Sequence, residues 1–301
     1  MTDSEQNPIE ETPDEVSVDF DTLDLPVELN DAITSLGFTS CTPVQSEVLP
    51  FSLDGRDIIA QAQTGTGKTA AFLISIITYD LENPELNQRA AGTPFSLIIA
   101  PTRELVLQIS ADAESLVENT DITIVPVVGG IDYEKQKKAL AKPVGIVVAT
   151  PGRLLDFCRS NVIDLSSVEL LIIDEADRML SMGFIPDVKA IIQRTPRKDK
   201  RQTQLFSATF SEDIKRLAAN WTLDPVRIEI EPEQIAVESV EQVVYATSED
   251  DKYKVLYNLI TVHELSRVLV FVNRRDESRK LEDKLYRHGF KTGLLTGEVP
   301  Q

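Results

Sequence analysis

The sequence "AQTGTGKT" at residues 62–69 combines residue types that together could hold a polyphosphate. Gly65 and Gly67 allow backbone N–H groups to turn toward phosphate oxygens, Lys68 can reach the outer phosphates, and the hydroxyl of Thr69 can bind Mg²⁺. The general pattern G-x-x-x-x-G-K-[ST] has a glycine at the position of Ala62. The simpler interpretation is a glycine-rich turn that caps an ordinary helix. The flanking segments decide between the two.

A strand and a helix are predicted on either side of this loop. Upstream, "RDIIAQ" has the composition of a buried strand, and downstream "KTAAFLISIITYDL" has helical periodicity. A loop between a strand and a helix N-terminus is the setting in which proteins bind phosphates. We therefore predict a nucleotide site here, despite Ala62.

Two adjacent carboxylates, Asp174 and Glu175, follow the apolar run "LLII". In enzymes with this kind of phosphate loop, an aspartate at the end of such a strand holds Mg²⁺ together with the loop hydroxyl, here Thr69. Glu175 would then orient or deprotonate the attacking water. An acidic turn facing solvent is the alternative, which the presence of "GKT" in the same chain disfavours.

The predicted fold class is α/β, with a doubly wound parallel sheet. Short β-branched runs alternate with helical patterns from Phe20 onward, which is typical of a parallel sheet covered on both faces. Ligands of such sheets bind beyond the carboxyl ends of the strands, and most of these runs end in a polar motif. The runs are "RDIIAQ", "SLIIAPT", "ITIVPVVGG", "VGIVVATP", "LLIIDEAD", "TQLFSAT" and "VRIEI".

A second group of motifs has the residue types that bind a nucleic-acid backbone. Hydroxyls, glycines and arginines stand at three predicted strand-to-helix junctions, where they can offer side-chain and backbone donors to phosphates. Few aromatics accompany them, so base stacking and sequence readout are not expected. The residues are Thr102, Arg103, Gly129, Gly130, Thr150, Gly152 and Arg153.

At first sight, the net charge of −19 argues against nucleic acid as a partner, because binders of polyphosphates usually have a basic surface. However, eleven of the 49 acidic residues lie within residues 1–31, which contain no lysine or arginine. Two basic clusters remain, at residues 135–142 and 194–201. A solvated surface explains such clusters about as often as RNA does.

The cellular setting follows from the cysteines and the apolar runs. Cys41 and Cys158 lie far apart without metal-ligand spacing, which fits a reducing compartment. No apolar run approaches the length that spans a bilayer, and the acidic N-terminus does not have the pattern of a signal peptide. We expect a cytoplasmic protein without membrane contact.

Four parts are predicted along the chain: a disordered acidic leader at residues 1–19, an α/β domain at 20–230, a linker at 231–239 and a second unit at 240–301. In the second unit, "VEQVVYAT" and "RVLVFVN" are predicted strands, whereas "DKYKVLYNLITV" and "DESRKLEDKLYRHG" are predicted helices. About sixty residues are too few for a complete α/β domain, so we expect the chain to be cut within this unit.

The order of these motifs resembles that of the DEAD-box RNA helicases, superfamily 2 enzymes built from two RecA-like domains. The resemblance covers the chain from Phe20 and implies a complete first RecA-like domain with a partial second one. In this family, alanine is usual at the position of Ala62. The implied cofactors are ATP and Mg²⁺, and the implied partner is RNA.

On the nucleotide side, "GFTSCTPVQ" resembles the adenine-reading Q motif. The resemblance implies that Gln45 hydrogen-bonds the adenine while Phe20 and Phe38 pack around the base. "DEAD" is similar to motif II, in which Asp174 and Glu175 act with Lys68 in catalysis. The implied loop residues that bind nucleotide are Thr64, Gly65, Thr66, Gly67, Lys68 and Thr69.

On the RNA side, "PTREL", "GG" and "TPGRL" resemble motifs Ia, GG and Ib, which adds Pro101 and Pro151 to the expected contacts. "SAT" resembles motif III, which couples the nucleotide site to strand separation through Ser207, Ala208 and Thr209, and we add Asp177 to this coupling set. "VFVN" resembles motif IV. Arginines of motif VI, which the family uses in hydrolysis, would lie beyond Gln301, so we expect these residues alone to be inactive in unwinding.

Within the family, "CTPVQ", "ADAESL", "IEIEPEQ" and "LLTGEVPQ" look most like the RhlB type of bacterial helicases, which assist an RNA-degrading complex. Two other classes of function fit the sequence less well. An RNA-binding scaffold without turnover would need a damaged nucleotide site, but Lys68, Thr69, Asp174 and Glu175 are all intact. A P-loop kinase or GTPase has no role for the Q motif, "SAT" or "TPGRL".

Overall fold

The structure is a computed structural model that describes residues 18–85, 89–230, 241 and 243–296. The chain divides into two compact units, Met1–Glu233 and Gln234–Gln301. The predicted linker at residues 231–239 and the predicted leader, apart from Val18 and Asp19, lie outside the described residues. Those two residues make backbone contacts, because Cys41 N–H donates to the Val18 carbonyl and Asp19 forms a β-bridge with Ser40.

The first unit contains a seven-stranded sheet in the order β3-β4-β2-β5-β6-β1-β7, in which every neighbouring pair is parallel. All seven strands predicted for this unit are present, which confirms the α/β fold class. The strands are β1 (Ile58–Gln61), β2 (Ser96–Ile99), β3 (Ile124–Val127), β4 (Ile146–Ala149), β5 (Leu170–Ile173), β6 (Gln202–Ser207) and β7 (Val226–Glu229).

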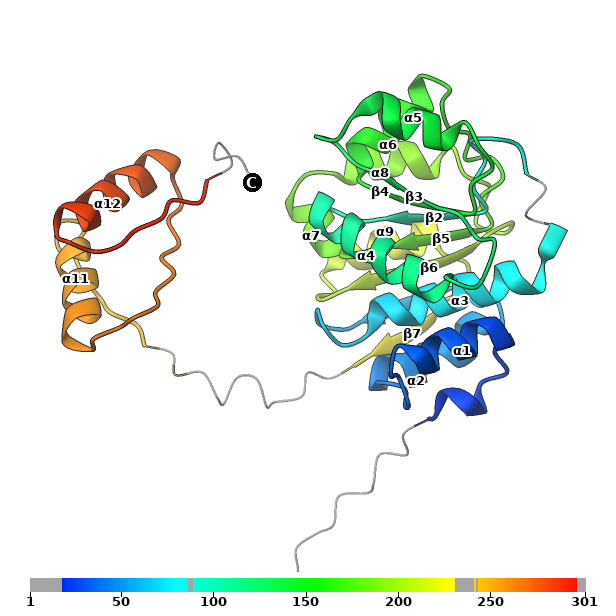
Figure 1. Cartoon of the computed structure of the whole chain (residues 1–301), viewed down its shortest axis with the longest axis horizontal. Coiled ribbons are helices and arrows are strands. Elements are labelled where there is room, and N and C mark those ends of the chain that lie inside the picture. The colour runs from blue at the N-terminus through cyan, green and yellow to red at the C-terminus, as the bar shows by residue number, and fades with distance from the viewer. Residues whose placement is uncertain (1–17, 86–88, 231–240, 242, 297–301) are drawn as a thin grey trace, which may run out of the picture. The chain divides into compact units, whose positions relative to one another are not determined.

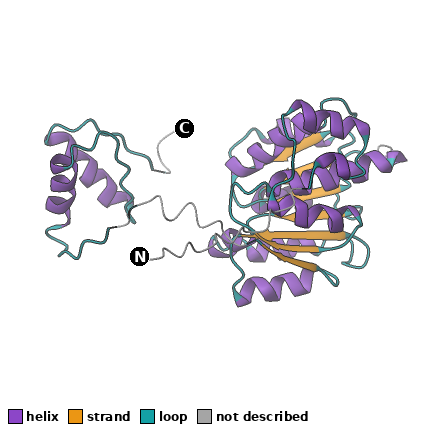
Figure 2. Cartoon of the chain, turned by 90° about the horizontal axis from the view of Figure 1, so that it is seen from below, coloured by secondary structure: helices purple, strands orange, loops and turns teal. Residues whose placement is uncertain are grey.

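Helices cover the sheet on both sides (Figures 1 and 2), and successive strand residues alternate between two cores. In β5, Leu170 and Ile172 pack in one core, whereas Leu171 and Ile173 pack in the other. This alternation follows from the period of two in a strand, and it explains why a run such as β5 is apolar throughout. Helices α1 (Val27–Ser35), α2 (Pro43–Leu53), α3 (Lys68–Glu82) and α4 (Arg103–Leu116) contribute to the first core. Helices α5 (Tyr133–Leu140), α6 (Pro151–Arg159), α7 (Ala176–Ser181), α8 (Ile185–Ile192) and α9 (Glu212–Trp221) contribute to the second.

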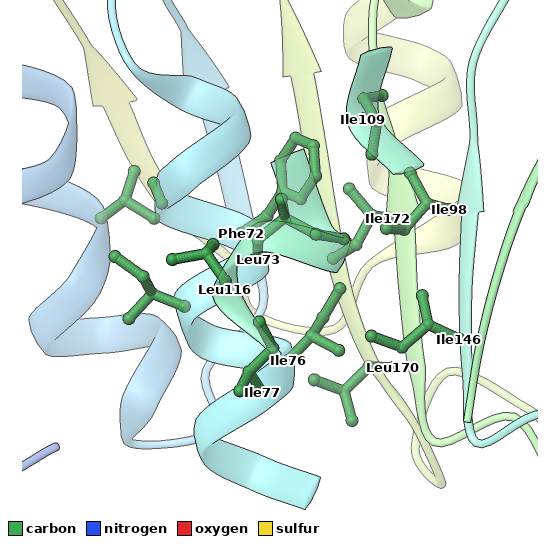
Figure 3. Close-up of a cluster of buried hydrophobic side chains, with 14 of the residues drawn as sticks. Phe72, Leu73, Ile76, Ile77, Ile98, Ile109, Leu116, Ile146, Leu170 and Ile172 are labelled. Atoms are coloured by element: carbon green, nitrogen blue, oxygen red, sulfur yellow. The ribbon is translucent and has the colours of Figure 1, made fainter. Parts of the chain in front are cut away.

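The first core fixes α3, and therefore the loop that precedes it, against the sheet. Figure 3 shows Phe72 and Ile76 of α3 facing Ile172 of β5, and none of these three side chains is accessible to solvent. Truncating a buried isoleucine or phenylalanine to alanine costs about 2–5 kcal/mol, so this packing holds the helix N-terminus firmly in place.

Local sequence signals define where the helices at the functional edge begin. The Thr102 hydroxyl accepts a hydrogen bond from Leu105 N–H at 3.2 Å, which caps α4. Proline occupies the first position of α2 and of α6, where its missing N–H costs nothing. A short 3₁₀ helix (Phe20–Thr22) precedes α1.

The second unit contains the two predicted helices, α11 (Lys252–Val262) and α12 (Arg275–Arg287). They contact each other through aromatic side chains, since the ring of His288 lies 5.6 Å from that of Tyr253 and 5.5 Å from that of Tyr257. Tyr253 Oη and His288 Nδ1 are also 2.9 Å apart. No helix among the residues described in either unit is long and apolar enough to cross a membrane.

The prediction of two strands in the second unit is wrong. Residues 243–247 and 267–273, the described parts of "VEQVVYAT" and "RVLVFVN", have no regular secondary structure. Val244 is 94% exposed and Phe271 is 92% exposed, so neither segment buries an apolar face. A strand needs a hydrogen-bonded neighbour, and isolated pairs are marginally stable, so β-type residues alone do not make a strand.

Candidate functional site

The strand order places the predicted motifs in two neighbouring groups along one edge of the sheet. The central strands β5, β6 and β1 lead into "DEAD", "SAT" and the phosphate loop, and the neighbouring strands β3, β4 and β2 lead into "GG", "TPGR" and "PTRE". Because all strands are parallel, their carboxyl ends meet at the same edge. The structure therefore brings the predicted nucleotide residues together on one part of the edge and the predicted RNA residues together on the adjacent part.

The phosphate loop connects β1 to α3 and has two glycines in the left-handed region. Gly65 has φ +87° and Gly67 has φ +96°, conformations that favour glycine. The Lys68 ammonium is 8% exposed and donates hydrogen bonds to the carbonyl oxygens of Ala62 and Gln63, each at 2.6 Å. Burial lowers the pKa of Lys68, while the carboxylates of Asp174, Glu175 and Asp177 oppose that shift. Lys68 therefore lies next to the acidic motif.

Gln45 connects α2 to this loop. Its Oε1 accepts from Thr42 N–H at 2.8 Å, and its Nε2 donates to the Gly67 carbonyl at 3.2 Å. The side chain is only 4% exposed. Of the two aromatic residues expected around the base, Phe38 is 46% exposed, whereas Phe20 is 3% exposed and packs in the first core.

Asp174 directly follows β5 and is a buried carboxylate. It is 3% exposed, and its Oδ1 accepts a hydrogen bond from Glu175 N–H at 2.9 Å. Burial raises the pKa of Asp174 to about 6, which the ammonium of Lys68 partly opposes. A buried carboxylate of this kind gains stability when a second cation approaches it.

Glu175 has an unusual backbone, with φ +51° and ψ +50° at the start of α7. A residue other than glycine in the left-handed region costs free energy, and such positions cluster at functional sites. Its carboxylate forms an ion pair with Arg178 at 3.1 Å. This partner was not predicted, although its spacing of three residues on a helix is the one signal that could have found it.

The coupling residues form a closed set of contacts between the acidic motif and "SAT". Ser207 Oγ accepts from Asp177 N–H at 3.3 Å and donates to the Thr209 carbonyl at 2.8 Å. The Thr209 hydroxyl donates to Asp177 Oδ2 at 3.1 Å. Ala208, between them, is exposed and forms none of these contacts. The end of β6 is therefore tied to the helix that follows β5.

On the RNA side, the loop that follows β3 connects the two arginines. Arg103 Nη1 donates to the Gly130 carbonyl at 3.4 Å, and Arg153 Nη1 donates to the Ile131 carbonyl at 3.5 Å. Pro101 and Pro151 are buried, whereas Gly129, Gly130 and Gly152 are exposed. Thr150 precedes α6 and its side chain makes no capping hydrogen bond. Thr102, by contrast, already caps α4 with its hydroxyl.

One residue that holds the loop after β3 in place was not predicted. Gln136 of α5 is 6% exposed, and its Oε1 accepts from Val128 N–H at 2.9 Å. Its Nε2 donates to the carbonyls of Val128, Ile131 and Asp132 at 3.2–3.3 Å. Gln136 lies within a basic cluster of the sequence, and nothing in that pattern marks it as buried.

The basic cluster at residues 194–201 has partners within the protein. Lys198 Nζ donates to the carbonyl oxygens of Ala219 and Thr222, at 3.2 and 2.9 Å. Arg201 is 8% exposed and donates to the hydroxyls of Thr195 and Thr203. Lys198 and Arg201 therefore hold contacts within the protein, whereas Arg197 of the same cluster has a side chain that is 88% exposed.

Comparisons with known proteins agree with this arrangement. The family model described as DEAD/DEAH box helicase matches residues 42–217. The chain is 53% identical over 290 residues to the ATP-dependent RNA helicase RhlB of Pseudomonas putida KT2440, covering 96% of this chain and 73% of that protein. The RhlB of Xanthomonas oryzae pv. oryzae is 41% identical over 285 residues, with 94% of this chain and 50% of that protein covered.

A similar solved structure is the crystal structure of a DEAD box protein from the hyperthermophile Methanococcus jannaschii, with a TM-score of 0.65 and 34% identity. That match covers 94% of this chain and 74% of the other. The expected RecA-like fold and the expected family are thereby confirmed. The chain belongs to the DEAD/DEAH box helicase family.

Proposed function

We propose that these residues belong to an ATP-dependent RNA helicase, which uses ATP to separate short RNA duplexes and remodel RNA. One observation supports the proposal: strands β5, β6 and β1, which lead into the proposed nucleotide residues, lie beside strands β3, β4 and β2, which lead into the proposed RNA residues. The contacts among Asp177, Ser207 and Thr209 connect the acidic motif after β5 to the "SAT" motif at the end of β6.

Lys68 would bind the outer phosphates of ATP. Its two present acceptors are loop carbonyls, so contact with a phosphate exchanges neutral acceptors for charged ones, which form stronger hydrogen bonds. The loop residues Thr64, Gly65, Thr66 and Gly67 would supply backbone donors. Gln45 would recognise adenine, because a carboxamide can donate and accept at once, and Phe38 and Phe20 would line the base end.

The residues present fit a magnesium ion. Mg²⁺ usually binds one or two carboxylates and keeps several waters and substrate phosphates as ligands. Among the described residues, no group of three or more His, Cys, Asp or Glu could hold a metal ion. Asp174 and the Thr69 hydroxyl would hold the ion, and the raised pKa of Asp174 is that of a carboxylate which a cation would stabilise. When bound, Mg²⁺ neutralises charge that develops on the phosphates.

Glu175 would orient the attacking water and accept its proton. The water oxygen forms a bond to the γ-phosphorus, the bond to the bridging oxygen breaks, and ADP and phosphate are the products. The conversion of ATP to ADP and phosphate would be transmitted to the RNA-binding residues by Asp177, Ser207, Ala208 and Thr209.

The RNA backbone would bind at the edge of the sheet where strands β3, β4 and β2 end. Arginines, hydroxyls and backbone N–H groups contact phosphates without reading sequence, so we expect little sequence preference. The proposed contact residues are Pro101, Thr102, Arg103, Gly129, Gly130, Thr150, Pro151, Gly152 and Arg153.

Equilibrium binding of fluorescent ATP and GTP analogues with Mg²⁺ tests the proposal. The chain should prefer ATP, Lys68→Ala should lose most of the affinity, and the exposed Lys142→Ala should keep it. Single-turnover hydrolysis by the complete protein should fall in Glu175→Gln while ATP binding is retained. Equal affinity for ATP and GTP, or a Lys68→Ala variant that binds normally, would contradict the nucleotide assignment.

We also propose a cytoplasmic location, because Cys41 and Cys158 are both free and buried. Participation in an RNA-degrading complex is proposed on the likeness to RhlB-type helicases alone. Immunoprecipitation of the complete protein from cells, followed by an assay for copurifying ribonuclease activity, tests that part.

A further inference from the structure

The two arginines expected to contact RNA are held only weakly by hydrogen bonds. The contacts from Arg103 to Gly130 and from Arg153 to Ile131 are 3.4 and 3.5 Å long, at the limit of a hydrogen bond. Long, flexible arginine side chains lose entropy when they are fixed in one rotamer. A further contact is therefore needed to hold either guanidinium in the rotamer that binds a phosphate.

Arg153 has such a contact, and Arg103 has none of this kind among the described residues. The guanidinium carbon of Arg153 lies 5.4 Å from the ring centre of Tyr133 and 5.7 Å from that of Phe157, so the cation lies over both rings within cation–π distance. The two rings are themselves 4.8 Å apart with an interplanar angle of 56°. Phe157 is fully buried, whereas Tyr133 is 36% exposed and lies at the surface beside the arginine.

The position of Tyr133 is fixed from both sides. Its hydroxyl lies 3.3 Å from Ser160 Oγ, at the end of α6. The preceding residue, Asp132, caps α5 by accepting from the N–H groups of Glu134 and Lys135. Gln136 holds the loop of residues 128–132 from beneath. Tyr133 is therefore the first helical residue after a well-anchored loop.

Stacking also leaves the useful part of the guanidinium available. An aromatic ring contacts the face of the guanidinium, while the five N–H donors point outward in its plane. One of them is directed to the Ile131 carbonyl, and the others can form the paired hydrogen bonds that phosphate favours. A lysine at this position would lose this arrangement, because an ammonium has no planar set of donors.

We propose that Tyr133 is a positioning residue for RNA binding, which holds the Arg153 guanidinium by cation–π stacking so that its N–H donors face the RNA backbone. The inference rests on the proposed RNA contact of Arg153 and assigns to Tyr133 a role beyond packing α5 against α6. Tyr133 does not itself contact RNA in this account.

The salt dependence of RNA binding separates this role from a merely structural one. The logarithm of affinity for single strands falls with the logarithm of salt by about 0.7 for each phosphate contact. Binding of fluorescein-labelled oligouridine would be measured by anisotropy over a series of KCl concentrations. The variants are Tyr133→Leu, which removes the aromatic face, Tyr133→Phe, which keeps the face and loses the hydroxyl, Arg153→Gln and the Arg153→Gln, Tyr133→Leu pair.

Tyr133→Leu should bind RNA about two- to five-fold more weakly, as expected for the loss of one exposed cation–π contact, with a salt slope lower by up to about 0.7. Tyr133→Phe should match the unchanged chain, and the pair should match Arg153→Gln. Affinity for Mg·ATP serves as the folding control and should be the same in all variants.

Four results would overturn the inference. If Arg153→Gln lowers the slope but Tyr133→Leu does not, Tyr133 has no positioning role although the RNA contact stands. If the effects of the two substitutions add in the pair, the residues act separately. If Arg153→Gln leaves the slope unchanged, the RNA contact itself is wrong, and this inference falls with it. A loss of ATP affinity in Tyr133→Leu would show a structural role instead.

Discussion

Gln45 Nε2 donates a hydrogen bond to the Gly67 carbonyl oxygen at 3.2 Å, although 22 residues separate the two along the chain. The element expected to read the base therefore directly contacts the loop expected to hold the phosphates. A Cβ atom placed on Gly67 would lie 2.6 Å from the same nitrogen, which shows how closely α2 approaches the loop. Two predictions follow from this contact.

Replacing Gln45 with alanine should weaken ATP binding while GTP binding stays poor. The substitution removes both the proposed adenine contact and the hydrogen bond to Gly67. Loss of hydrogen bonds in a buried site costs about 1–3 kcal/mol, or roughly five- to hundred-fold in affinity. Isothermal titration with each nucleotide measures the change, and the exposed Gln108→Ala is the control. ATP affinity that is unaltered in Gln45→Ala would remove the adenine assignment.

Gly67→Ala should destabilise the chain and abolish nucleotide binding. The new Cβ would meet Gln45 and Thr42 at 2.6 and 2.7 Å, and the φ of +96° disfavours any residue with a Cβ. Gly183→Ala is the matched control, because Gly183 has φ +77° but a Cβ at that position would have no atom within 4 Å. Left-handed strain alone costs roughly 1–2 kcal/mol. Denaturant unfolding should therefore show a larger loss of unfolding free energy for Gly67→Ala than for Gly183→Ala. Equal losses would mean that Thr42 and Gln45 can move away from the new Cβ without a cost in free energy.

Asp174→Asn should stabilise the fold at neutral pH and abolish Mg²⁺-dependent ATP binding. Burial raises the pKa of Asp174 to about 6, above its ordinary value of 3.8. The native state therefore binds the proton more tightly than the unfolded state, and stability is lost as pH rises from about 4 through 6. A shift of about two units corresponds to roughly 2–3 kcal/mol. The gain from asparagine should appear above pH 6 and vanish below about pH 4.

Asp80 provides the control for this experiment. It lies farther along α3, is 2% exposed, and burial raises the pKa of its carboxyl to about 6 as well. Asp80→Asn should show the same pH-dependent stabilisation without any loss of ATP binding. If both variants lose Mg²⁺-dependent binding, the effect of Asp174→Asn is not a sign of metal ligation.

Thr209→Val should separate ATP binding from RNA binding. The Thr209 hydroxyl donates to Asp177, and valine keeps the shape of threonine without that hydrogen bond. We expect the affinities for each ligand alone to remain nearly unchanged and the increase of RNA affinity on addition of ATP to fall. Thr209→Ser keeps the hydroxyl and should behave as the unchanged chain. If ATP still increases the RNA affinity of Thr209→Val to the full extent, contacts other than this hydrogen bond connect the two sites.

Local signals in the sequence were sufficient for much of the fold. Central runs such as β5 form strands because they are apolar on both faces and lie between helices. The strand order was not predictable, because pairings such as β2 with β4 and β5 depend on non-local packing. The separation of nucleotide motifs from RNA motifs is a result of that order.

The errors and omissions share a physical cause. Phe271 and its neighbours have strand-type residues but no hydrogen-bonded partner strand in the described part of the second unit, so the predicted strand of "RVLVFVN" is wrong. Gln136 and Tyr133 lie in a segment that reads as a charged helix, and their roles depend on the loop and on α6. Contacts of this kind depend on tertiary structure and leave no local pattern.

Hydrogen–deuterium exchange of the chain, measured separately with Mg·ATP and with single-stranded RNA, tests the central claim most directly. The account predicts that Mg·ATP slows exchange at residues 42–45, 62–69 and 174–177. RNA should slow exchange at residues 101–105, 129–133 and 150–153, which follow the neighbouring strands β2, β3 and β4. Protection by RNA at the basic cluster of residues 194–201, with none at the three junctions, would contradict the assignment of the two parts of the sheet edge.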